Sequence, residues 1–105
     1  MAIKTTDIDF IPKVLRANIP VLVYFWAEQH KSCYTVTPIV EELTGEYKDK
    51  LKVCKVNIDE APYVSSEYDI KVIPAFLLFK SGKLVKKLIN LSAKAEIETA
   101  IKHYI

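Results

Sequence analysis

The changing period of the apolar residues constrains the fold of this chain more than any other feature. Three short runs at 21–26, 51–58 and 75–79 are rich in β-branched and aromatic residues, and each has the length of a buried strand. The sequence leaves open whether residues 2–4 form a further strand at the edge of the sheet. Between the first two runs, apolar side chains recur with helical spacing at Val36, Ile39, Val40, Leu43 and Tyr47. Strands that alternate with helices in this way predict an α/β fold.

Shorter signals complete the predicted order of elements. Helices are expected at 8–15, at 62–68 and after Ser92, whose hydroxyl can cap the last one. The turn at 80–83 joins the third strand to a fourth at 84–89, as in a β-hairpin. The resulting order α-β-α-β-α-β-β-α predicts a central mixed sheet with helices on both faces.

Length, charge and cysteine content narrow the class of protein. The 105 residues match one domain, spanning 1–105, and a net charge of +2 gives no reason to expect nucleic acid or a membrane surface as a partner. The N-terminal segment lacks the pattern of a secretory signal, and no apolar run is long enough to cross a bilayer. Two cysteines are too few for a disulfide framework. We therefore expect a cytoplasmic protein and a monomer.

Several separate stretches occur in the order known from one protein family. They are the apolar run and its continuation at 21–28, the helix proline Pro38, the segment 55–59, the Ile73–Pro74 step before 75–79, and the turn at 80–83. Together they resemble the thioredoxin family from about Thr5 to the C-terminus. The resemblance implies the thioredoxin fold, in which Pro38 bends its helix and the peptide bond before Pro74 is cis.

The catalytic motif of that family is altered in this chain. Where the family has Trp-Cys-Gly-Pro-Cys, this sequence reads Gln29-His30-Lys31-Ser32-Cys33. The resemblance implies that His30 replaces the attacking cysteine, that Cys33 matches the second cysteine, and that Tyr24 replaces a buried aspartate. Thiol–disulfide exchange needs one thiolate to attack and a second thiol to release the product. We therefore expect little or no disulfide reductase activity, and the sequence leaves open whether the chain is an enzyme.

The remaining cysteine chemistry has a second interpretation. His30 and Cys33 are three positions apart at a predicted helix start, where an imidazolium and the helix N-terminus both favour a thiolate. A single reactive Cys33 would form mixed disulfides with glutathione or with a protein. Cys54 is not expected to join it, because it adjoins Lys55, which matches a family lysine beneath the active site, and neighbouring strand residues face opposite ways. His30 and Cys33 are too few for a zinc site, so we expect no metal and no cofactor.

The substrate surface of the family offers a binding function that needs no thiol. Its matching positions here are Gln29, His30, Lys31, Ser32, Val72, Ile73, Pro74, Ile89 and Asn90. Val72 and Ile89 replace family glycines and make this surface more apolar, as is typical of interaction sites. We expect the apolar residues to be at least partly exposed. Two functions therefore stand: a module that binds a protein or peptide in this groove, and, as the alternative, a monothiol redox protein that acts through Cys33 in redox homeostasis.

Overall fold

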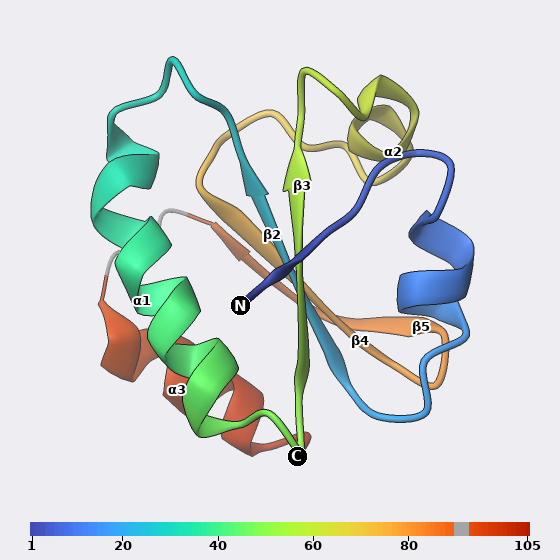
Figure 1. Cartoon of the computed structure of the whole chain (residues 1–105), viewed down its shortest axis with the longest axis vertical. Coiled ribbons are helices and arrows are strands. Elements are labelled where there is room, and N and C mark those ends of the chain that lie inside the picture. Colours follow the sequence, from blue (N-terminus) through green and yellow to red (C-terminus); the bar gives the residue numbers. More distant parts are fainter. Residues whose placement is uncertain (90–92) are drawn as a thin grey trace.

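A five-stranded mixed sheet organises the chain, as the computed structural model shows for residues 1–89 and 93–105 (Figure 1). In the order β1-β3-β2-β4-β5, the strands are β1 (Ile3–Lys4), β2 (Val21–Trp26), β3 (Lys52–Asn57), β4 (Ala75–Lys80) and β5 (Lys83–Ile89). β3 runs parallel to both β1 and β2, whereas β4 is antiparallel to its neighbours β2 and β5. β2 therefore lies at the centre of the sheet, with one parallel and one antiparallel neighbour.

Helices cover both faces of this sheet. They are η1 (Ile11–Leu15), a short π-helix, and the α-helices α1 (Ser32–Glu46), α2 (Pro62–Glu67) and α3 (Lys94–Lys102). Figure 1 shows α1 and α3 together on one side of the sheet, and η1 and α2 on the other. This arrangement confirms the predicted α/β fold. Among the described residues, none of these helices is long and apolar enough to cross a membrane.

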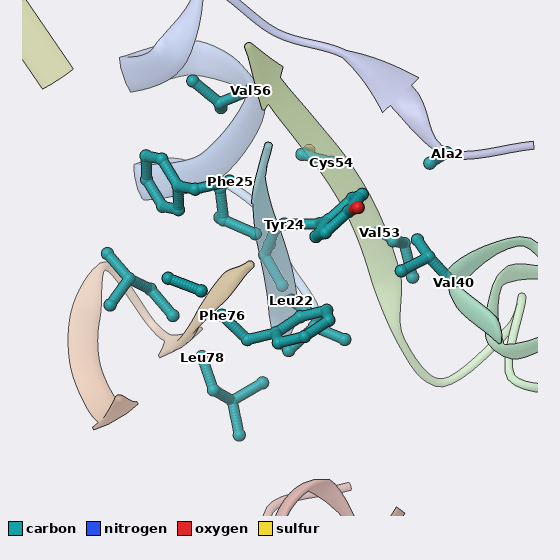
Figure 2. Packing of buried hydrophobic residues seen from close by; sticks show 14 of the residues in the cluster. Ala2, Leu22, Tyr24, Phe25, Val40, Val53, Cys54, Val56, Phe76 and Leu78 are labelled. Carbon is teal, nitrogen blue, oxygen red and sulfur yellow. The ribbon is translucent and has the colours of Figure 1, made fainter. Parts of the chain in front are cut away.

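The apolar strands form the core because they are buried from both sides. Every residue from Val21 to Phe25 in β2 and from Ala75 to Phe79 in β4 is almost completely covered. Figure 2 shows Tyr24 and Phe25 of β2 between side chains of β3, such as Val53, and side chains of β4, such as Phe76. Central strands covered by helices on two faces have no polar side, and this is why the sequence has continuous apolar runs here rather than alternation. The core fixes the strand ends, from which the candidate site is built.

Two helix starts differ from the sequence expectation. The first helix begins at Ile11 rather than near Ile8, which is 93% exposed and packs against nothing in the core. A turn precedes it, closed by the Thr6 backbone N–H, which donates to Asp9 Oδ1 at 2.7 Å. At the last helix, the expected cap Ser92 lies outside the described residues, and Ala93 occupies the N-cap position without a side-chain bond.

Asp7 does not cap the helix that follows it but the distant helix α2. Its two carboxylate oxygens accept hydrogen bonds from the backbone N–H groups of Tyr63 at 3.0 Å and Val64 at 2.8 Å. These N–H groups belong to the first turn of α2, where no preceding carbonyl is available. The N-cap residue of α2 itself, Ala61, makes no side-chain bond. One carboxylate thus connects two segments 56 residues apart and holds η1 against α2.

We expect Asp7→Ala to lower the free energy of unfolding by about 1–2 kcal/mol, the range measured for lost helix caps. Two donors of α2 lose their partner, and the negative charge that favours a helix N-terminus is lost too. Urea denaturation followed by circular dichroism measures the effect. Asp49→Ala is the matched control, because Asp49 is exposed and, among the described residues, its side chain bonds to no helix end. Equal stability of the two variants would contradict the capping role.

Candidate functional site

The segment from His30 to Cys33 forms a tight turn between β2 and α1. The backbone N–H of His30 donates to Ala27 O at 3.2 Å, and that of Cys33 donates to His30 O at 3.0 Å. Lys31 is the N-cap residue of α1, so His30 lies before the helix and Cys33 lies within its first turn. The imidazole is exposed, whereas Cys33 is 0% exposed. His30 therefore precedes α1 instead of sharing its first turn with Cys33.

Full burial of Cys33 changes what its thiol can do. The sulfur is covered in the folded protein, and it is a free thiol. Direct attack on a protein disulfide needs contact between the thiolate and a sulfur of the substrate. At this site such contact requires the turn to open first. The exposed groups at the turn are instead the side chains of Gln29, His30, Lys31 and Ser32.

Tyr24 lies directly beneath the start of α1. Its hydroxyl donates to the Cys33 carbonyl oxygen at 3.2 Å and lies 3.1 Å from Thr37 Oγ1, which donates to the same carbonyl at 3.0 Å. The ring stacks on Phe76 with a centroid distance of 5.2 Å. Burial raises the pKa of Tyr24 well above its ordinary value; the Thr37 bond opposes this shift, and the nearby Cys33 adds to it. Tyr24 is therefore a neutral anchor for the helix, and it cannot accept a proton as a general base would.

Thr37 is the one residue of this network that the sequence analysis missed. A threonine one turn after Cys33 carries no motif, and only its spacing of four residues from Cys33 hinted at a shared helix face. Its hydroxyl bonds to a carbonyl in the turn where Pro38 interrupts the helix, a common use of threonine at such bends.

The loop before β4 meets the His30–Cys33 turn. The peptide bond between Ile73 and Pro74 is cis, and Ser32 Oγ is 3.5 Å from the Ile73 carbonyl oxygen. Val72 is 44% exposed and Ile89, which pairs with the first residue of β4, is 43% exposed. Ile73 is only 8% exposed and Pro74 is buried, so the expectation that both contribute exposed apolar surface is wrong. Asn90 lies outside the described residues.

A small polar cavity lies beside this turn. Its volume is about 210 Å³, and its lining residues are Lys4, Trp26, Glu28, Lys55, Asn57 and Glu60. Lys55 pairs with Tyr24 across β2 and β3, as expected for a lysine near the site. Within the described part of the chain, the buried Trp26 Nε1 has no hydrogen-bond partner. Two lysines, two carboxylates, an asparagine and the Trp26 side chain therefore line the cavity near the carboxyl ends of the parallel strands.

Cys54 lies away from this site. It pairs with Val23 in the parallel ladder, and its neighbour Lys55 pairs with Tyr24, whose hydroxyl reaches Cys33. Because neighbouring strand residues face opposite sides, Cys54 points to the face opposite Cys33. Burial raises the pKa of Cys54, with partial compensation by a bond to Thr5. The two cysteines are both free thiols on different faces of the sheet, as the sequence predicted.

Comparison with known proteins identifies the family. The Thioredoxin family profile matches residues 1–103. The chain belongs to the thioredoxin family. It is 47% identical over 94 residues to thioredoxin from Rickettsia felis, which is 90% of each chain. It is 44% identical over 99 residues to the chloroplastic M-type thioredoxin of Chlamydomonas reinhardtii, covering 94% of this chain and 71% of that protein. Thioredoxin 1 of Synechococcus elongatus is 38% identical over 105 residues, which is 100% of this chain and 98% of that protein.

A metal ion would need more ligands than His30 and Cys33 supply. Across residues 1–89 and 93–105, no group of three or more His, Cys, Asp or Glu side chains is arranged to hold a metal ion. His30 is exposed before α1, and Cys33 is covered within its first turn.

Proposed function

We propose that this member of the thioredoxin family binds a protein or peptide partner at its active-site surface and has little or no disulfide reductase activity. The active-site surface is defined here by six exposed residues: Gln29, His30, Lys31, Ser32, Val72 and Ile89. The observation that carries the proposal is the complete burial of Cys33, the one thiol at this surface. Because no thiol is exposed at this surface, the function that the surface itself supports is binding of a protein or peptide partner.

The chemistry of the turn supports a role without turnover. Release of a mixed disulfide requires a second thiol, and position 30 holds an imidazole instead. Cys54 faces the other side of the sheet and cannot supply that thiol. Tyr24 provides no carboxylate to assist proton transfer, since it is a phenol with a raised pKa. No cofactor is part of the proposal.

The surface itself is suited to a protein partner. Thioredoxin-family proteins act on protein substrates, and Val72 and Ile89 leave almost half of their apolar side chains exposed beside the His30 turn. Ile73 and Pro74, which follow Val72 in the loop, are buried. Apolar residues gathered beside polar ones are typical of interaction sites. We propose that the chain works in this way as a single cytoplasmic domain and as a monomer, without glutathione.

Substitutions at the active-site surface test the binding function. Val72→Asp and Ile89→Asp each place a charge on the proposed contact, and we expect them to abolish recovery of partners that the wild-type protein retains from an extract of its own cells. Stability should change by less than about 0.5 kcal/mol, because both positions are exposed. Cys33→Ser should retain the same partners. Quantitative mass spectrometry of the retained proteins provides the measurement.

The opposite pattern would favour the monothiol alternative. A free Cys33 in the first turn of α1 is the feature that speaks for it, because a helix N-terminus stabilises a thiolate once the turn opens. If Cys33→Ser removed the partners, and if a reductant released them from the wild-type protein, the interaction would be a mixed disulfide. The proposed non-covalent binding would then be wrong.

A further inference from the structure

A second exposed apolar region lies on the opposite side of the sheet from α1, where η1 and α2 meet. Ile8, Ile11 and Tyr63 are exposed there, and Figure 1 shows η1 beside α2. The Asp7 bonds to α2 hold the two helices together. We call this region the η1–α2 cavity; its lining residues are Asp7, Phe10, Ile11, Leu15, Tyr63, Val64, Glu67 and Tyr68.

The size and floor of the cavity suit one large apolar side chain. Its volume is about 160 Å³, close to the roughly 150 Å³ at which an apolar cavity accepts a benzene ring. Phe10 and Tyr68 form part of its wall, with ring centroids 5.6 Å apart, and both pack on Phe79 of the core at 5.8 and 5.4 Å. Because the wall is anchored in the core, the cavity exists before any ligand arrives.

The rim of the cavity is acidic. Asp7 and Glu67 line it, and no basic side chain does so within the described part of the chain. Asp7 is already bonded to α2, whereas Glu67 is exposed and, among the described residues, forms no ion pair. Of the four carboxylates in the stretch 59–69, Glu60 pairs with Lys4 and Asp69 pairs with Lys71, so the negative charge at the rim comes from Glu67. This local negative charge favours a positively charged partner.

We infer that the η1–α2 cavity is a docking site for a basic protein segment. The segment places one aliphatic or aromatic side chain in the cavity, against the Phe10 and Tyr68 rings, and an adjacent Lys or Arg pairs with Glu67. This inference does not depend on the active-site surface, which shares no residue with the cavity. A single inserted side chain beside one ion pair gives weak, reversible binding, in which the apolar contact contributes most of the affinity.

A designed peptide provides the test. The probe is a short acetylated and amidated peptide with one central Leu between Arg residues, titrated into the full ¹⁵N-labelled chain. We expect shifts of the backbone amide signals of Ile11, Tyr63 and Glu67, and weaker binding at high salt. Replacing the central Leu by Ser should weaken binding about tenfold or more, since the apolar contact is lost. Replacing the Arg residues by Glu should weaken binding about fivefold or more, because attraction to Glu67 becomes repulsion.

Protein variants separate this site from the active-site surface. Glu67→Gln should weaken binding of the peptide about twofold to fivefold, the range for an exposed ion pair. Glu28→Gln should have no effect on this binding, because Glu28 does not line the cavity. Shifts confined to residues 29–32 and 72, or equal binding of the Glu-containing peptide, would overturn the inference. Concentration-dependent dimers that Glu67→Lys abolishes would also overturn it, because a second copy would then be the occupant.

Discussion

His30→Cys is expected to turn the chain into a protein that reduces insulin disulfides, whereas the unmodified chain stays at the uncatalysed rate. The substitution restores two thiols in one turn. The backbone bond from Cys33 N–H to the carbonyl of residue 30 closes that turn at 3.0 Å, and such turns hold the first and last Cα atoms within about 7 Å. Disulfides need Cα atoms about 4.4–6.8 Å apart. The backbone is therefore already shaped for the bond.

The regained activity should be slow. A correctly positioned general base raises the rate of a proton-transfer step by about 10²–10⁴-fold, and Tyr24 offers no carboxylate for this role. Thiol counting after mild oxidation should show one disulfide in His30→Cys and none in the unmodified chain. The control is His30→Cys with Cys33→Ser, which should remain inactive. Wild-type turnover that depends on Cys33, or a His30→Cys variant that cannot oxidise, would contradict the proposed reason for inactivity.

The central strands of the sheet could be predicted from the sequence because they are buried on both faces. β2 was expected at 21–26 and occupies Val21–Trp26, since a strand covered on both faces must be apolar throughout. α1 was recognisable because its apolar residues face one sheet surface at helical spacing. The strand ends then placed His30, Cys33 and Val72 in one region through the family resemblance. Local patterns were sufficient wherever one element meets the core along its whole length.

The remaining features depend on contacts between distant segments, which no local pattern records. Burial of Ile73 follows from the loop folding under its neighbours, although Val72 beside it stays exposed. Asp7 directly precedes the helix expected at 8–15, yet its carboxylate oxygens accept hydrogen bonds from α2, 56 residues later. α1 begins after His30, although the sequence placed both His30 and Cys33 at a helix start. Each difference arose where a tertiary contact outweighed a local preference.

Tyr24→Asp is expected to produce the largest loss of stability, and the loss should grow as the pH rises. The aromatic ring fills a fully packed position against Phe76, and removal of a buried aromatic side chain costs about 3–5 kcal/mol. The new carboxyl is also desolvated, which raises its pKa above the unfolded value of about 3.9. The folded state then binds this proton more tightly than the unfolded state does.

The sign of the pH effect follows from that difference in pKa. Below about pH 4 the carboxyl is protonated in both states, and only the lost packing counts. As the pH rises from there to the folded pKa, the variant loses about 1.4 kcal/mol per unit of pKa difference. Urea denaturation at several pH values, compared with Tyr24→Phe, separates the two contributions, because Phe keeps the ring and loses only the bonds to Cys33 and Thr37. The Phe variant should cost about 1–2 kcal/mol at every pH. A Tyr24→Asp protein that instead became more stable between pH 4 and pH 7 would show that attraction to Lys55 exceeds the cost of burial, because only a depressed pKa gives that sign.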